Sequence, residues 1–313
     1  MTTRHAEGSA PGKVIVCGEH SVVYGRPAIA VPVSDLRARA RIEAAPPDSG
    51  LRIVAVSLDE ALTLDGAPFD HPLAAIVRLA LAHLQADAPD AVLTVDSDLP
   101  IGAGLGSGAA VSVAMVRALA AFLEHEITVD AISALTYEVE KIHHGTPSGI
   151  DNTVVAWERP VYFVKDAALE VFTIGAPLHL LIADSDVGGS TRAAVAGVRQ
   201  RREQAREIYE AHFDQMGAIA DAARCAIERG EQARLGKLLD ENHMRLREIG
   251  VSIPALDRLV AAAREAGALG AKLTGAGMGG NIIALAPEAQ IESIRRALLR
   301  AGARRVWHTI VGG

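Results

Sequence analysis

The stretch DLPIGAGLGSGAA, residues 98–110, contains four alternating glycines (102, 104, 106 and 108) and one serine, Ser107. A strand-like run, 91–95, precedes it, and an apolar run that predicts a helix, 111–123, follows it. A glycine-rich turn that opens a helix lets backbone N–H groups approach an anion, and the helix dipole favours negative charge there. We therefore expect a phosphate group at this turn; a plain flexible connection is the alternative.

The turn matches neither of the two common phosphate fingerprints. A Walker loop requires a lysine directly after its last glycine, and none follows here. The fragment GAGLG, 102–106, is one residue short of the dinucleotide-binding pattern G-x-G-x-x-G. A different class of phosphate-binding loop is therefore indicated.

Composition limits the class of protein. The 313 residues suffice for one large or two ordinary domains, and half of them are hydrophobic. A net charge of −7, without a basic patch interleaved with aromatic residues, argues against nucleic-acid binding. Two cysteines fit a reducing compartment, and neither a signal-peptide core nor an apolar run of about 18 residues is present. We expect a soluble cytoplasmic protein that does not act on membranes.

Polar residues flank a short apolar strand near the start of the chain. A polar segment, 1–10, is expected to be irregular, and the strand is predicted over 14–17. Lys13 stands at the entrance of this strand, where a solvated strand end is the simplest interpretation. Glu19 and His20 follow its exit, and either a polar ligand site or a surface turn explains them.

An acidic residue lies at the edge of a predicted amphipathic helix, 130–143. The buried stripe of this helix is predicted from apolar residues with helical spacing: Ile132, Leu135, Val139 and Ile142. Glu140 lies beside this stripe, so it either reaches into a site or is a solvated helix acid.

A second acid follows a turn. Asp151 comes after the sequence TPSG and precedes an apolar run, 154–157, so it is either an Asx-turn residue or a positioned carboxylate. His143 and His144 suggest a metal site, but no third ligand recurs at a suitable spacing, and structural roles are favoured.

The second half of the chain predicts a helix-covered antiparallel sheet in an α+β layer. We place the domain boundary between 1–173 and 174–313. Strands are predicted over 178–183, 282–286 and 305–311, with helices over 231–248, 254–266 and 287–301. A helical tract, 192–229, is expected to break near Gly217 and to bury Cys225. A second glycine cluster, KLTGAGMGGN, occupies 272–281.

Three stretches, PGKVIVCGEHSVVYG, LPIGAGLGSGAA and KLTGAGMGGN, together resemble the three motifs of the GHMP kinases. Within this superfamily, GEHSVVYG with HGTPSGIDN is similar to the mevalonate kinase family. The resemblance covers nearly the whole chain. It implies an N-terminal ATP-binding domain like domain 2 of ribosomal protein S5, a ferredoxin-like C-terminal domain, and an active site in the cleft between them.

The resemblance also implies roles for individual residues. Asp151 matches the catalytic aspartate and Lys13 the lysine that assists it. Glu140 and Ser107 match Mg²⁺ ligands. Positions that match contacts to ATP are Lys13, Ser97, Pro100, Gly102, Ala103, Gly104, Leu105, Gly106, Ser107 and Gly108. Positions that match contacts to mevalonate are Glu19, His20, Asp151, Thr191 and Gly275.

One position departs from the family pattern. Many family members carry a second serine, a Mg²⁺ ligand, where this chain has Gly108. Either water completes the coordination of Mg²⁺, which the ion readily accepts, or Ser107 takes over.

The reaction that the resemblance implies is transfer of the ATP γ-phosphoryl group to the primary hydroxyl of mevalonate, with Mg²⁺ as cofactor. The resemblance also implies a homodimer. The alternatives are a phosphomevalonate kinase, a homoserine kinase, a mevalonate 3-kinase or a decarboxylase relative. A non-catalytic nucleotide-binding member is a further alternative, although such a protein needs none of Lys13, Glu140 and Asp151.

Overall fold

The computed structural model describes residues 4–100, 102–144 and 147–312, without the side chains of His143 and His144. The structural roles expected for these two histidines therefore fall outside the described residues. Contacts divide the chain into two units. The first unit comprises 1–12, 36–101 and 106–158, and the second comprises 13–35, 102–105 and 159–313. The division into sequence domains at residue 173 stays a prediction.

The first unit contains a mixed sheet. Strand β5 (Ala91–Ser97) pairs in parallel with β3 (Leu51–Ala55) and antiparallel with residues 38–44 of β2 (Ala28–Ala44). Strand β4 (Glu60–Thr63) pairs with β3 after a short 3₁₀ helix, Val56–Leu58. Alternation of apolar and polar residues in β2 and β5 buries one face, as Ile42 and Leu93 show by having no exposed surface.

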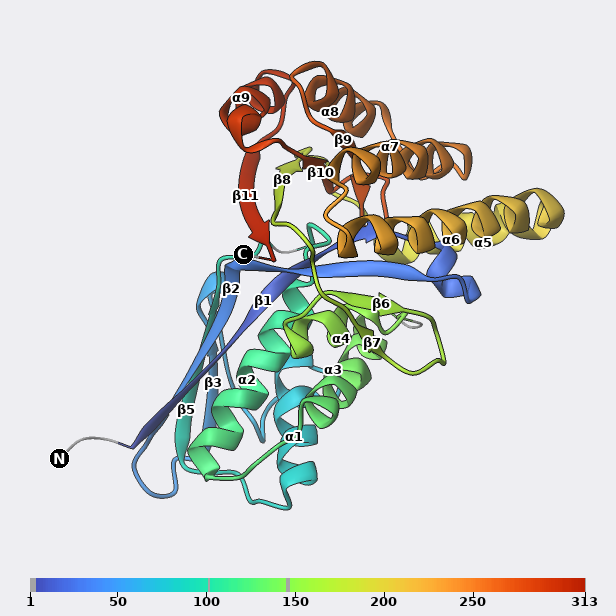
Figure 1. Cartoon of the computed structure of the whole chain (residues 1–313). Helices are drawn as coiled ribbons and strands as arrows, with labels where there is room; N and C mark the ends of the chain where they lie inside the picture. Colours follow the sequence, from blue (N-terminus) through green and yellow to red (C-terminus); the bar gives the residue numbers. More distant parts are fainter. Residues whose placement is uncertain (1–3, 101, 145–146, 313) are drawn as a thin grey trace. The chain divides into compact units, whose positions relative to one another are not determined.

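The described residues of the same unit form four helices: α1 (Pro72–Leu84), α2 (Ser107–Leu123), α3 (Val129–His144) and α4 (Ile150–Trp157). Figure 1 shows them gathered beside the strands of this unit. Helix α2 is rich in alanine and valine and is buried along most of its length, with Met115 and Leu119 at most 1 % exposed. Its first turn is thereby fixed directly after the glycine-rich loop.

The second unit follows the order β-α-β-β-α-β of a ferredoxin-like fold. Its antiparallel sheet has the strand order β11-β8-β10-β9. The bounds are Leu178–Asp184 (β8), Gly270–Thr274 (β9), Asn281–Leu285 (β10) and Arg305–Val311 (β11). The predicted α+β layer is confirmed.

Helices fill the crossovers of this sheet (Figure 1). They are α5 (Thr191–Gln204), α6 (Arg206–Glu228), α7 (Gln232–Glu248), α8 (Pro254–Glu265) and α9 (Ile291–Arg300), with a 3₁₀ turn at Glu288–Gln290. Phe213, Leu259, Leu273 and Ile294 belong to the core that the sheet shares with these helices.

The second unit also contains the end of a strand that starts in the first unit, and several short elements. The 3₁₀ turn η1 (Ser21–Tyr24) follows strand β1 (His5–Cys17). Strand β6 (Val161–Phe163) pairs with the start of β2 and with β7 (Glu170–Val171).

Four expectations about local structure are wrong. Residues 5–10 are not irregular but form the start of β1. The long helical tract breaks at Ala205 rather than at Gly217, which lies inside α6 where an added Cβ would sit 3.2 Å from the Arg26 side chain. Cys225 is exposed, and Ile142 is 40 % exposed, because each lies on the solvent side of its helix.

Candidate functional site

The first glycine loop has the backbone that its composition predicts. Gly102, Gly104 and Gly106 have φ angles of 72°, 78° and 72°, a region that residues with a side chain seldom adopt. Gly106 is the N-cap of α2, and Ser107 is its first helical residue. The loop therefore delivers the chain directly into a helix N-terminus, where unpaired N–H groups and the helix dipole favour phosphate.

The second glycine loop is more tightly confined. Gly275, Gly277, Gly279 and Gly280 all have positive φ angles, between 74° and 137°. A Cβ at Gly277 would lie 2.3 Å from the carbonyl oxygen of Val251, so a side chain cannot be accommodated there. These glycines let the loop pass between neighbouring backbone segments.

The two glycine loops lie against each other within the second unit. The Asn281 amide donates a hydrogen bond to the carbonyl oxygen of Ala103, and Gly275 and Gly280 would place an added Cβ within 4 Å of the first loop. A small pocket separates them, lined by Gly102, Ala103, Gly104, Gly189, Thr191, Thr274, Ala276, Gly277, Gly279 and Gly280. Four residues with expected contacts, Gly102, Ala103 and Gly104 for ATP and Thr191 for mevalonate, thus line one pocket.

Strand β1 is joined to both loops. The backbone N–H of Lys13 donates to the carbonyl oxygen of Leu105 at 2.9 Å. Thr274 extends this attachment, because its hydroxyl accepts from the N–H of Ile15 at 3.0 Å and donates to the carbonyl of Ile15 at 2.9 Å. Lys13 is only 3 % exposed, so its interpretation as a solvated strand end is wrong.

Glu19 and His20 are buried, which excludes the surface turn. One carboxylate oxygen of Glu19 accepts from the ammonium group of Lys272, and the other accepts from the Asn242 amide at 3.1 Å. His20 lies 2.8 Å through Nε2 from the carbonyl oxygen of Ala276. The turn is thus bound to β9, α7 and the second glycine loop.

His20 is held as a neutral imidazole. Burial lowers its pKa to about 4, and the carbonyl of Ala276 opposes that shift only in part. A carbonyl oxygen can only accept, so Nε2 carries the proton and donates it. The second ring nitrogen, Nδ1, is therefore a hydrogen-bond acceptor.

Glu140 lies beside the first turn of α2 in the first unit. It is 6 % exposed, so it is not a solvated helix acid. An added Cβ on Gly108 would lie 3.2 Å from its Oε1 atom. Its carboxylate therefore sits next to the position that carries a serine in many family members.

Asp151 is the second residue of α4, so the Asx-turn interpretation is wrong. It is half-buried. Its helix is anchored by the next two residues: Asn152 donates to the Ser133 hydroxyl at 2.9 Å, and Thr153 donates to the carbonyl of Gly149 at 2.6 Å. The carboxylate is therefore presented from a fixed helical turn.

Ser97 is the last residue of β5, and Pro100 lies between this strand and the first glycine loop. The hydroxyl oxygen of Ser97 accepts from the N–H of Leu99 at 3.2 Å, and the Ser97 N–H donates to Asp96 at 2.9 Å. Both residues are half-buried, and the hydroxyl of Ser97 orders the turn that leads into the loop.

The sequence interpretation missed three residues around these loops: Lys272, Asn242 and Asn281. None of the three has exposed surface. A lysine inside the apolar run GAKLT was the available signal, because a lysine is almost never fully buried unless it is paired. The two asparagines gave no signal, since nothing in their local sequence separates them from helix or strand surface.

Comparison with known proteins agrees with this geometry. The model named GHMP kinases N terminal domain matches residues 73–158, and the model named GHMP kinases C terminal matches residues 223–304. The mevalonate kinase of Pyrococcus abyssi is 39 % identical over 304 residues, which cover 91 % of this chain and 89 % of that protein. That of Thermococcus sibiricus is 37 % identical over 302 residues, covering 91 % and 90 %.

Solved structures agree as well. The L. major mevalonate kinase in complex with R-mevalonate superimposes with a TM-score of 0.86 at 28 % identity, covering 97 % of this chain and 95 % of that one. The fold, the two glycine loops and the extent of the sequence match all indicate the same family. The chain belongs to the GHMP kinase family and, within it, to the mevalonate kinases.

Proposed function

We propose that the protein transfers the γ-phosphoryl group of ATP to the primary hydroxyl of mevalonate and releases ADP and 5-phosphomevalonate. One observation carries this proposal: the segment 272–281 contacts both the loop expected to hold phosphate and the turn expected to hold the acceptor. It does so through Asn281 on Ala103 and through Ala276 on His20. A kinase needs both substrates positioned by one rigid element.

The chemistry follows from the residues that match the family motifs. The hydroxyl oxygen attacks the γ-phosphorus while the bond from phosphorus to the β-bridging oxygen breaks, and Asp151 accepts the hydroxyl proton. Lys13 stabilises negative charge on the oxygens involved. Backbone N–H groups of 102–108 hold the phosphates, because the left-handed glycines leave no side chains in the way.

Mg²⁺ fits the residues present. The described residues contain no cluster of three or more histidine, cysteine, aspartate or glutamate side chains suited to a metal. Glu140, whose carboxylate lies beside the first turn of α2, would hold the ion with Ser107, phosphate oxygens and water, which is the coordination Mg²⁺ prefers. The ion would neutralise phosphate charge. A water molecule would replace the ligand that a serine hydroxyl at position 108 would otherwise supply.

The acceptor site of this proposal consists of the residues that match mevalonate contacts in the family. Thr191 is exposed at the first turn of α5, and His20 supplies a neutral ring. Glu19 and Gly275 complete the set expected around mevalonate. A homodimer and a cytoplasmic location stay predictions; no helix among the described residues is long and apolar enough to cross a membrane.

A substrate panel tests the proposal. Purified protein with Mg²⁺ and ATP would be given mevalonate, 5-phosphomevalonate, homoserine or galactose, with ADP release as the readout and ³¹P NMR to assign the product. We expect turnover of mevalonate alone, with the 5-phosphate as product. A 3-phosphate, another acceptor, or nucleotide binding without turnover would refute it in favour of one of the alternatives.

A further inference from the structure

A fully buried charge network lies behind the turn that carries His20. We propose that Lys272 and Asn242 are positioning residues for the acceptor substrate, which act by fixing Glu19 and, through it, His20. The inference rests on the proposed function. It gives Glu19 an indirect role in place of the direct contact with mevalonate that the family resemblance implies.

The burial and bonding of Glu19 support an indirect role. Glu19 is 1 % exposed, and Lys272 and Asn242 have no exposed surface. Lys272 binds Oε1 of the carboxylate, and Asn242 donates to Oε2 at 3.1 Å. Because both oxygens are engaged inside the protein, the carboxylate has almost no surface to offer a ligand.

The backbone conformation of His20 requires that its neighbour Glu19 be held in place. His20 has a φ angle of 62° and a ψ angle of −49°, which lies outside the regions that residues with a side chain normally adopt and is therefore strained. Strain of this kind persists only where the surroundings fix it, and it gathers at functional sites. Glu19 fixes one side of His20, and the hydrogen bond from Nε2 to Ala276 fixes the other.

Three residues at alternate positions of one segment, 272–276, bind the turn of His20 and the strand before it. Lys272 binds Glu19, Thr274 binds Ile15, and Ala276 binds His20. Lys272 and Thr274 are two residues apart in β9, so their side chains lie on the same side of the strand, and the backbone carbonyl of Ala276 reaches His20 from the loop that follows. That same segment continues into the glycine loop that contacts Ala103. A shift of Lys272 or Thr274 would therefore move His20 relative to the phosphate loop.

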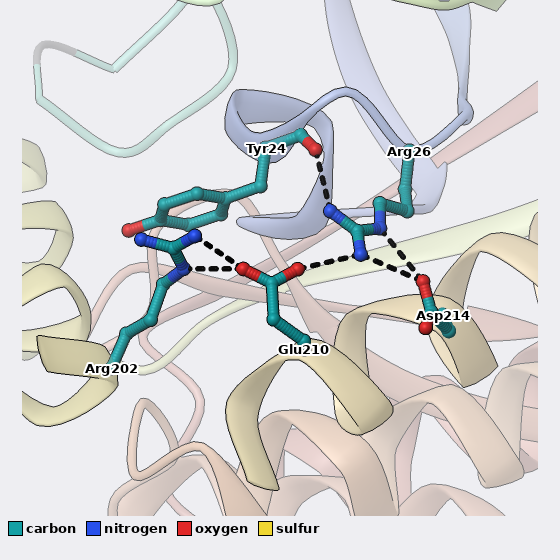
Figure 2. A network of polar contacts seen from close by, with 5 residues as sticks. All are labelled: Tyr24, Arg26, Arg202, Glu210 and Asp214. Carbon is teal, nitrogen blue, oxygen red and sulfur yellow. Dashed lines mark hydrogen bonds and ion pairs between the residues drawn. The ribbon is translucent and has the colours of Figure 1, made fainter. Parts of the chain in front are cut away.

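The far end of the turn is held by a separate network, which Figure 2 shows. Glu210 lies between Arg26 and Arg202, with 2.6 Å from its Oε2 to Arg26, and Arg26 also donates to the Tyr24 carbonyl at 2.8 Å. The side chains of Arg26 and Glu210 are about a quarter exposed. Because these side chains reach solvent and those of Glu19 and Lys272 do not, the Glu210 network is the control for the buried network.

The test uses kinetics of the full-length protein. The variant Glu19→Gln/Lys272→Met removes both charges together, so no unpaired charge is left buried and folding is preserved. We expect its KM for mevalonate to rise between about 10- and 100-fold, the range for a misplaced substrate contact, with the KM for ATP within about 2-fold. The control Glu210→Gln makes the same chemical change at the other end of the turn and should leave both KM values within about 2-fold of wild type.

A second readout does not require turnover. Imidazole ¹⁵N NMR should show His20 as the Nε2–H tautomer in the unmodified protein and as a mixture of tautomers in the double variant. An unchanged KM for mevalonate, or equal rises in both KM values, would overturn the inference. Failure of the unmodified protein to phosphorylate mevalonate would refute the proposed function, and the NMR result would still decide whether the network holds His20.

Discussion

Replacing Asn281 with alanine removes the one side-chain hydrogen bond that joins β10 to the first glycine loop in the described part of the chain. Asn281 has no exposed surface, and its amide donates to the half-buried carbonyl of Ala103. The substitution leaves that carbonyl without its donor. We therefore expect the segment 102–104 to lose its fixed position, and with it part of its affinity for the ATP phosphates.

The size of the effect follows from this bond. Leaving a buried acceptor without its partner costs about 1–3 kcal/mol, which corresponds to about 5- to 150-fold in affinity. Ala103 is a half-buried residue, so we take the lower part of this range and expect a rise in the KM for ATP of about 10-fold. Global stability should change little, because Oδ1 of Asn281 is buried without a partner and its removal offsets part of the loss.

The assay separates these two consequences. ADP release at varied ATP and at varied mevalonate gives both KM values, and thermal unfolding followed by circular dichroism gives Tm. Asn281→Asp is the companion variant, since it keeps the shape and removes the donor, and it should raise the KM for ATP at least as much. A lowered Tm with an unchanged KM for ATP in both variants would refute the reasoning, because Asn281 would then serve stability alone.

Three further perturbations have definite expected results. Asp151→Asn should lower kcat by about 10²- to 10⁴-fold with the fold intact, the range for losing a general base, and an unchanged kcat would remove Asp151 from the mechanism. Gly108→Ser should be tolerated, because among the described residues only the flexible carboxylate of Glu140 lies within 3.4 Å of the new Cβ. The serine should lower the Mg²⁺ concentration needed for half-maximal activity, and a higher requirement would contradict the site. His20 and His243 have pKa values lowered to about 4 by burial, so the unfolded chain binds more protons than the folded one between about pH 6.5 and pH 4. The free energy of unfolding should therefore fall as pH drops through this window, by on the order of 3 kcal/mol for each histidine. Urea unfolding of the unmodified protein and of His243→Gln measures this fall. An unfolding free energy that did not fall with pH in either protein would contradict the prediction.

Much of the fold was predictable because it depends on local patterns. The antiparallel sheet of the second unit and the helix after the first glycine loop follow from apolar runs that adjoin glycine-rich turns. Gly217 was misassigned as a break for a physical reason: glycine also permits close packing, and its neighbour Arg26 is remote in sequence. The break at Ala205 has no glycine or proline to mark it.

The solvent exposure of charged and polar side chains was predicted least well from the sequence. Lys13, Glu19, His20 and Glu140 each allow a solvated interpretation, and all four are buried. Whether a charged side chain is buried depends on partners that can lie hundreds of residues away, as Lys272 lies from Glu19. Such partners become visible only when the chain is folded.

The sequence by itself determined that the chain carries two glycine loops and the lysine, glutamate and aspartate of a GHMP kinase. It could do so because loop conformation and motif chemistry reside in consecutive residues. Only the tertiary structure decided that residues 272–281 bind both the phosphate loop and the turn of His20, and that Glu19 is bonded on both oxygens. These are contacts between segments far apart in the chain, and their energies depend on burial, which no local pattern encodes.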